Sequence, residues 1–336
     1  MDPRVRSFLS DLLATPSPTG FELEGQREWA KFVQPFVDHI DSDTYGNTWG
    51  MIAGEGEHRL MLEAHADEIG MMVNHISDAG FLHVTRIGGM DRALIRGRRV
   101  RVLGSKGGVV GLVGHTAIHL RDAKDDKVPE WHEIYIDIGA SSRQEVEEMG
   151  VRVGHPAVVD EPVLWLGDNR IVARALDNRI GGFVIARVLQ ELASGPKSDA
   201  SVFGVNAVQE EIGGNGARMI TYRLRPTVAV VIDVTHATDS PGISHEKHGK
   251  VVLGGGPTVS HGTANHPLVV ERLMEVAAGE EIPLQHEASS RFTGTDADDV
   301  FVSRTGVPVA LLSVPMRYMH STVEMVDLAD VDHCIR

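Results

Sequence analysis

Residues 201–217 have the sequence SVFGVNAVQEEIGGNGA, in which a run of small and apolar residues ends in two neighbouring glutamates and a glycine cluster. The run over residues 202–208 is nearly continuous, which is typical of a parallel strand covered by helices on both faces. Charge at the end of such a strand has an ordinary explanation, a solvated pair where the strand meets water. The segment therefore predicts an α/β fold and raises the question of what Glu210 and Glu211 do side by side.

Length, charge and cysteine content narrow the classes of protein to consider. The chain has 336 residues, more than a single hydrophobic core usually serves, so we expect one large domain with an insertion, or two domains. A net charge of -15 disfavours nucleic acid and anionic membranes as partners, because both would be repelled. Cys334 is the single cysteine, so nothing indicates an oxidising compartment. No stretch approaches the ~20 apolar residues of a membrane span, and the start lacks a signal-peptide pattern, so we expect a cytoplasmic protein.

Two styles of sequence alternate along the chain. Helical spacing of apolar residues predicts a helix over residues 5–13, which the segment PSPTG ends before a second helix near Glu22. Further on, the pattern predicts a helix over residues 180–192 and strands over residues 202–208, 227–234 and 308–314. Helices alternating with buried strands indicate a mixed, mostly parallel sheet flanked by helices.

The stretch between these α/β parts has a different character. Short segments rich in valine, isoleucine and threonine, such as MMVNHISDAGFLHVTRIGG, are punctuated by glycine. Closely spaced strands with frequent turns are typical of a small antiparallel barrel or sandwich, with one short helix expected within residues 137–149 and a serine available to cap it. We therefore expect a discontinuous α/β domain, residues 1–69 and 164–336, and an inserted barrel-like β domain, residues 70–163.

Polar side chains follow each of four predicted strands in the α/β domain. His65 and Asp67 follow LMLEA, Glu210 and Glu211 follow VFGVNAVQ, Asp233 follows VAVVI, and His320 follows VALLSVP at a short distance. Ligands of open α/β sheets bind beyond the carboxyl ends of the strands, so these side chains would converge there. Asp177, in RALDNRIGG, adds another carboxylate just before a predicted helix. Nitrogen and oxygen donors without cysteine suit zinc, manganese or cobalt, and the set is large enough for two ions.

Several motifs together resemble one known family. AHADEIG, ARALDNRIGG, VQEEIGGNGA, GTDA at residues 294–297 and SVPMRYMHSTVE occur in this order along nearly the whole chain. They resemble the TET-type dinuclear metal aminopeptidases, which include glutamyl and leucyl aminopeptidases and some members labelled endoglucanase. The resemblance implies a fold similar to that of dizinc exopeptidases. It also implies that the inserted β segment dimerises the chain, and that the homo-oligomer is a tetrahedral dodecamer of such dimers.

The same resemblance implies a role for each candidate site residue. His65 and Asp233 would hold one divalent ion, Glu211 and His320 the other, Asp177 would bridge them, Asp67 would orient His65, and Glu210 would be the general base. The ions would be zinc or cobalt, with manganese as an alternative, and the substrates would be short peptides with a free N-terminus. Two such ions can activate a water, polarise the scissile carbonyl and anchor the amino terminus.

The two glutamates can serve one site only if the backbone bends beside them. Consecutive residues on a strand point to opposite faces of the sheet. Gly213 and Gly214 follow closely and would permit such a bend.

Two functions from other classes are the alternatives. A glycoside hydrolase would use two carboxylates without a metal and usually aromatic sugar platforms, whereas aromatic residues make up only 5% of this chain. A non-catalytic oligomeric binding protein could use the same fold, but it would have no reason to retain a full ligand set and a separate base. The sequence therefore favours a metal-dependent aminopeptidase.

Overall fold

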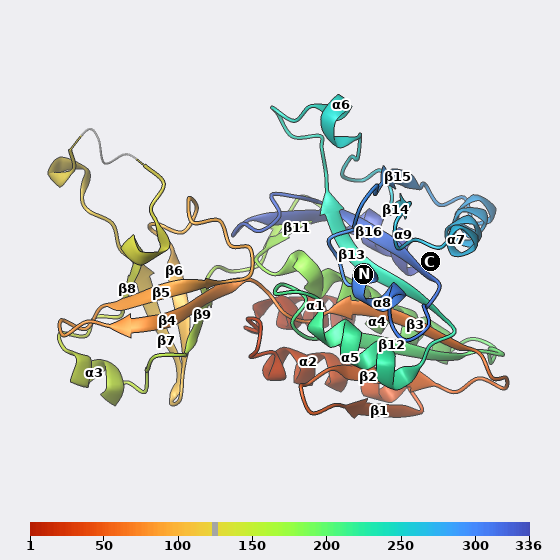
Figure 1. Ribbon diagram of the computed structural model, residues 1–336, viewed down its shortest axis with the longest axis horizontal. Helices are drawn as coiled ribbons and strands as arrows, with labels where there is room; N and C mark the ends of the chain where they lie inside the picture. The colour runs from red at the N-terminus through yellow and green to blue at the C-terminus, as the bar shows by residue number, and fades with distance from the viewer. Residues whose placement is uncertain (123–126) are drawn as a thin grey trace. The chain divides into compact units, whose positions relative to one another are not determined.

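The computed structural model describes residues 1–122 and 127–336 and divides into two compact units. The first unit comprises Met1–Asp67, Val163–Met319 and Val323–Arg336, and the second comprises Glu68–Pro162 and His320–Thr322. Within the described residues, the first unit contains a sheet of eleven strands with flanking helices, and the second contains a closed barrel (Figure 1). The predicted mixed α/β fold with an inserted barrel-like domain is confirmed.

The helices account for the longer amphipathic segments of the sequence. Those described are α1 (Pro3–Ala14), α2 (Leu23–Val33), α3 (Arg143–Glu148), α4 (Leu176–Ala193), α5 (Asn215–Leu224), α6 (His245–His248), α7 (Pro267–Gly279), α8 (Ala297–Phe301) and α9 (Leu328–Ile335), with short 3-10 turns η1 (Gln34–Phe36), η2 (Ile118–Leu120) and η3 (Trp131–Glu133). Within residues 1–122 and 127–336, no helix combines the length and apolar character that a membrane crossing requires.

The large sheet is parallel at its centre and antiparallel toward its edges. Its main path runs β1-β2-β12-β3-β13-β16-β17-β11-β10, and β14 pairs with both β15 and β16. The central strands β12, β3, β13 and β16 are all parallel to their neighbours in that group. The bounds are β1 (His39–Ser42), β2 (Thr48–Ile52), β3 (Arg59–His65), β10 (Leu164–Leu166), β11 (Arg170–Ala173), β12 (Ser201–Ala207), β13 (Val228–His236), β14 (Thr258–His261), β15 (Gln285–Ala288), β16 (Val309–Arg317) and β17 (Glu324–Asp327).

Register aligns the ends of the central strands. Ala207, the last residue of β12, pairs with His65, the last residue of β3. Strand β13 continues beyond the predicted end, because its pairing with β16 extends to His236 opposite Met316. Asp233 therefore lies inside a strand rather than after it, at the level where β3 and β12 end.

Both faces of the central sheet are buried, which explains the near-continuous apolar pattern of its strands. Helices α1, α2, α4 and α9 cover one face, where Leu62 and Ile232 join their core. Helices α5 and α8 cover the other face, where Met61 and Val231 lie in a separate core. Neighbouring residues on a strand point to opposite faces, so each face takes alternate side chains of the same run.

The second unit has a core of its own. Its strands close in the order β4-β5-β8-β7-β6-β9 around buried side chains that include Met71, Val84 and Val100. The predicted short helix is α3, and the Ser142 hydroxyl caps it by accepting a hydrogen bond from the Glu145 amide at 3.2 Å. The strands are β4 (Gly70–Ile76), β5 (Leu82–Ile87), β6 (Arg99–Gly104), β7 (Gly107–Val113), β8 (Tyr135–Asp137) and β9 (Pro156–Val159).

Candidate metal centre

Five of the predicted residues form two overlapping groups of potential metal ligands. In each group of three, one ligand atom per residue lies within 4.8 Å of the others. Asp177 belongs to both groups, the first with His65 and Asp233 and the second with Glu211 and His320. The described chain thus brings together two imidazoles and three carboxylates that are distant in sequence.

His65 presents its two ring nitrogens to different partners. Its Nε2 lies 3.2 Å from Asp177 Oδ1, 3.7 Å from Glu210 Oε2 and 3.9 Å from Asp233 Oδ1. Its Nδ1 lies 3.3 Å from the carbonyl oxygen of Asp67 and 3.4 Å from that residue's Oδ1. With Nδ1 directed at Asp67, Nε2 is the nitrogen available to a metal, an arrangement common among metal-bound histidines.

Asp67 also binds the backbone of the two glutamates. Its carboxylate accepts hydrogen bonds from the backbone amides of Glu210 (3.0 Å) and Glu211 (3.2 Å) and from the Thr19 hydroxyl (2.8 Å). Burial raises the pKa of Asp67, but hydrogen bonds from His65, Thr19 and the Glu210 amide outweigh it, so that the pKa lies below its usual range. Asp67 is therefore an ionised, fully buried acceptor.

The bend that lets both glutamates serve one site begins earlier than the sequence suggested. Strand β12 ends at Ala207, and Gln209 already has a left-handed backbone with φ of 61°. Gly213 and Gly214 have positive φ as well, but they lie after the pair and lead into α5. The glycines alone therefore do not account for the bend, because it starts at Gln209, before them. The buried Asp67 carboxylate fixes the two amides that follow Gln209.

Backbone strain gathers around the same residues. Ala175, Gln209, Tyr318 and His320 are non-glycine residues with φ between 57° and 63°, and each lies within two positions of a predicted site residue or is one. A left-handed conformation costs an L-residue roughly 1–2 kcal/mol. Such strain persists where the surrounding structure over-determines it, most often at functional sites.

The cluster contains several buried carboxyl groups close together, an arrangement that a bound cation would stabilise. Burial raises the pKa of Glu210 to about 9, with Asp233, Asp296 and Asp177 adding to the effect of burial. Burial also raises the pKa of Glu211 well above its usual value, and Asp177 reinforces the shift. Desolvation lowers the pKa of His65, yet surrounding carboxylates raise it well above its usual value. Divalent ions would compensate this density of carboxylates, so the donor set fits zinc, cobalt or manganese.

Several buried polar groups around the cluster were not predicted from the sequence. The Glu324 carboxylate accepts the backbone amide of Asp177 at 3.2 Å, and burial raises the pKa of Glu63 to about 8 beside Asp296. Asp296 and Glu324 lie inside the motifs GTDA and SVPMRYMHSTVE, so the signal was present without a role attached to it. Thr19 lies in PSPTG, where the sequence indicated only the end of a helix.

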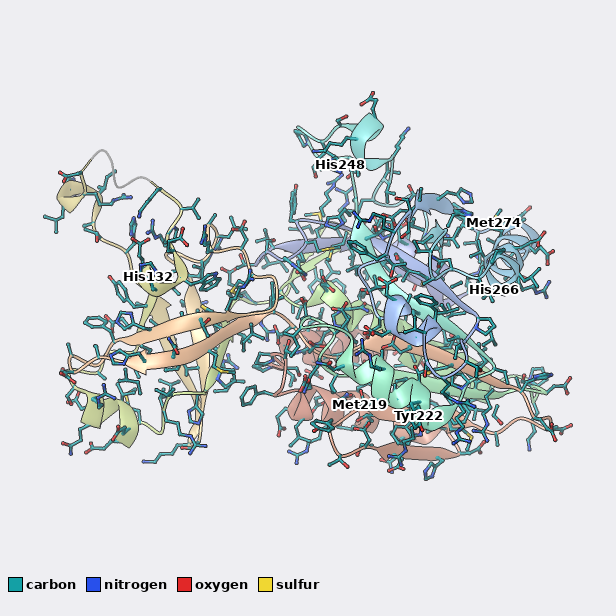
Figure 2. All side chains as sticks on the ribbon, viewed as in Figure 1. His132, Met219, Tyr222, His248, His266 and Met274 are labelled. Atoms are coloured by element: carbon teal, nitrogen blue, oxygen red, sulfur yellow. The ribbon has the colours of Figure 1, made fainter. Side chains whose placement is uncertain are left out.

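Other histidines lie on other elements. His65 and His320 are the histidines that join a three-residue ligand group within the described residues. The labelled His132, His248 and His266 belong to η3, to α6 and to the N-terminal boundary of α7 (Figure 2).

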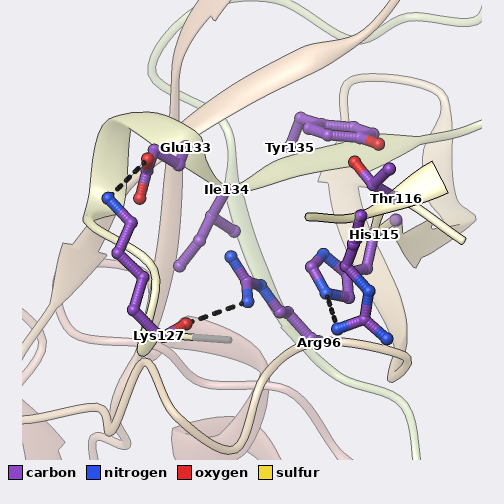
Figure 3. Close-up of a pocket in the computed structure, with 9 residues that line it drawn as sticks. Arg96, His115, Thr116, Lys127, Glu133, Ile134 and Tyr135 are labelled. Carbon is purple, nitrogen blue, oxygen red and sulfur yellow. Dashed lines mark hydrogen bonds and ion pairs between the residues drawn. The ribbon is translucent and has the colours of Figure 1, made fainter. Parts of the chain in front are cut away.

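A separate pocket in the second unit has a different chemistry. Its polar groups bond largely to one another: Arg96 donates to the Lys127 carbonyl at 3.2 Å, and Lys127 lies 3.3 Å from a Glu133 oxygen (Figure 3). Its lining contains none of the predicted site residues.

The sequence of the chain matches the model of a known protein family. The model described as M42 glutamyl aminopeptidase matches residues 46–336, most of the chain. The chain belongs to this family. The predicted resemblance is confirmed, and the family supports an aminopeptidase rather than the glycoside hydrolase alternative.

Individual relatives match this M42 aminopeptidase over nearly its whole length. The lysyl aminopeptidase of Pyrococcus furiosus is 37% identical over 335 residues, covering 98% of this chain and 94% of its own. The structure of aminopeptidase APDkam598 from the archaeon Desulfurococcus kamchatkensis has a TM-score of 0.92 and 38% identity, with 99% of this chain and 92% of that chain covered. A structure of the Pyrococcus horikoshii TET1 peptidase, described as assembling into a tetrahedron or a large octahedral shell, has a TM-score of 0.88 and 29% identity, covering 98% and 97%.

Asp67→Asn in this M42 aminopeptidase should weaken metal binding about 10- to 100-fold, because the amide removes the negative charge beside His65 and disrupts the hydrogen bonds that the carboxylate accepts. Metal titration followed by mass spectrometry of the dialysed protein measures the loss. Asp330→Asn is the matched control, since Asp330 is another buried carboxylate that accepts two backbone amides, from Gly254 and Gly256, each at 2.7 Å. Equal metal affinity in Asp67→Asn and the unmodified protein would contradict this role.

Proposed function

We propose that this chain removes the N-terminal residue of short peptides with two divalent ions and a separate carboxylate base. One observation carries the proposal: two three-residue ligand groups share Asp177. A shared carboxylate between two groups is what a pair of neighbouring ions requires.

Membership of these groups supports a role for each ligand. His65 and Asp233 would hold one ion, Glu211 and His320 would hold the other, and Asp177 would contribute to both sites. The mixture of imidazole nitrogen and carboxylate oxygen favours zinc or cobalt, with manganese as an alternative. Ions bound there would supply a polarised scissile carbonyl and an acidified water.

The Glu210 carboxylate takes and returns the proton. Glu210 lies outside both ligand groups, yet its Oε2 is 3.7 Å from His65 Nε2. A general base must lie beside the reacting atoms without being consumed as a ligand. With cations bound beside it to offset its raised pKa, Glu210 would be ionised. Its carboxylate oxygen would then accept a proton from the attacking water and deliver it to the nitrogen of the departing amine.

Removal of metal should abolish hydrolysis of aminoacyl fluorogenic amides, and zinc, cobalt or manganese should restore it, since the donors are nitrogen and oxygen. Amides with a free N-terminus should be cleaved, whereas their N-acetylated counterparts should be poor substrates. Rates measured before chelation, after it and after readdition of metal give the answer. Full activity in a verified metal-free preparation would overturn the mechanism, and equal rates on blocked and free amides would argue against an exopeptidase.

The two glutamates should respond differently to the same substitution. Glu210→Gln should keep its metal while the rate falls by ~10²–10⁴, the usual effect of losing a general base. Glu211→Gln should lose metal, because an amide oxygen is a weaker ligand than a carboxylate, and excess metal should partly restore its rate. Metal content and rates at saturating metal separate the two. Equal loss of metal in both variants would show that this division of roles is wrong.

We infer a homo-oligomer from the relatives, with the inserted β domain, residues 70–163, as the dimerising part. The Pyrococcus horikoshii TET1 peptidase is described as forming tetrahedral and octahedral shells, and this chain is similar to it over nearly the whole length of both proteins. In the second unit Val110, Leu112 and Val153 are apolar and more than half exposed, as expected of side chains that a partner copy covers.

Light scattering of the purified protein should therefore give a mass well above the 36.5 kDa of one chain. Replacing Val110 and Leu112 together by serine should lower that mass if the β domain carries the contact. An unchanged mass in the double variant would assign the contact to another surface.

A further inference from the structure

Part of the loop between α1 and α2 is buried, although most loops run over the surface. It carries PSPTG, and Ser17 and Thr19 are 0% and 4% exposed. Glu22, at the start of α2, is 4% exposed as well. Buried polar side chains must find hydrogen-bond partners inside the protein, so the contacts of these residues show what they stabilise.

These contacts converge on the turn that carries the two glutamates. The Thr19 hydroxyl donates to Asp67 Oδ2 at 2.8 Å, and the same oxygen accepts the amide of Glu211 at 3.2 Å. The other oxygen, Oδ1, accepts the amide of Glu210 at 3.0 Å. The loop thus reaches the base through one intermediate carboxylate.

A second carboxylate supports the preceding residue. Glu22 accepts the Gly20 amide at 2.7 Å, and its carboxylate also hydrogen-bonds with the amide of Gln209. Gln209 is the residue with the left-handed backbone. Three successive amides of the turn, those of Gln209, Glu210 and Glu211, therefore donate to buried carboxylates. The N-terminal loop provides one of these carboxylates, Glu22, and its Thr19 hydroxyl donates a hydrogen bond to the other, Asp67.

The orientation of Asp67 depends on a small number of donors. A carboxylate can rotate about its terminal bond unless its oxygens are fixed by directed hydrogen bonds. Thr19 supplies the side-chain hydroxyl among them, and the residue is buried. Removal of that hydroxyl leaves a buried oxygen with one donor fewer and frees the carboxylate to reorient.

We propose that Thr19 is a positioning residue for the reaction: its hydroxyl holds Asp67 in the orientation that fixes the Gln209–Glu211 turn and therefore the Glu210 carboxylate. The inference rests on the proposed role of Glu210 as base. It adds a residue from the N-terminal loop that belongs to neither ligand group. A small displacement of a catalytic group is enough to lower the rate, since a shift of about 1 Å can cost about 100-fold.

Thr19→Val tests this, because valine keeps the shape of threonine and removes only the hydroxyl. The value of kcat should fall about tenfold or more while KM changes less than about twofold and metal content is unchanged. Thr19→Ser should restore kcat, since serine keeps the hydroxyl. If Thr19→Val does not fold, Thr19→Ala removes the same hydroxyl without the added bulk at the site of the oxygen.

Hydrogen exchange gives a readout that does not depend on activity. In metal-free protein, the amides of Glu210 and Glu211 should exchange faster in Thr19→Val. Those of Gly254 and Gly256, which Asp330 binds, should be unchanged and provide an internal control. Thr221→Val is the matched variant, since Thr221 is also buried and, among the described residues, its hydroxyl hydrogen-bonds with the Met61 sulfur alone, at 4.0 Å.

Four outcomes overturn the proposal: an unchanged kcat, unchanged exchange at both glutamate amides, no recovery in Thr19→Ser, or a fall in kcat that follows a loss of metal. Failure of the proposed function is a separate result. It would appear as absence of metal-dependent peptide hydrolysis in the unmodified protein, whereas the exchange measurement would still report on the contact between Thr19 and Asp67.

Discussion

The hydrogen bonds to the Asp67 carboxylate link most parts of the candidate site. One fully buried anion lies against the Nδ1 side of His65, accepts the amides of Glu210 and Glu211, and receives the hydroxyl of Thr19. A buried carboxylate without such donors would be costly, and backbone amides without an acceptor would be costly as well. Each group therefore satisfies the other, and the result is a sharp turn at the end of β12 that places two consecutive glutamates beside the same imidazole.

This arrangement depends on the parallel centre of the sheet. Strands β12, β3 and β13 run in the same direction, and register brings the ends of β12 and β3 level with each other and with Asp233. The two faces of these strands are covered by separate helical cores, so the strand ends are the part of the sheet from which polar side chains can project without disturbing packing. The strained residues Gln209 and His320 lie where the chain leaves β12 and β16. Rigid strands on both sides of these turns hold the strain in place.

The electrostatics of the site have the same origin. Carboxylates from separate elements lie close enough to raise one another's pKa, and burial strengthens the effect. An assembly of this kind is stable when positive charge occupies its centre. The ligand groups that share Asp177 are consistent with two ions, and the membership of the chain in the M42 family agrees with this chemistry.

The sequence by itself determined the fold class and the inserted barrel, and it predicted the residues that the structure groups as possible metal ligands. Apolar periodicity records burial on one or two faces, and the change of style near residues 70 and 163 marks the change from helices and strands to short strands alone. Polar residues directly after buried strands are conspicuous because they interrupt this apolar pattern. Tertiary structure decided the rest. Glutamine has no special preference for positive φ, so the bend at Gln209 could be found only once the buried acceptors Asp67 and Glu22 were in place. Thr19 is separated from Asp67 by 48 positions, and a hydroxyl in a loop carries no periodic signal. Hydrogen bonds between distant segments depend on how the chain packs, and local sequence does not encode that partner choice.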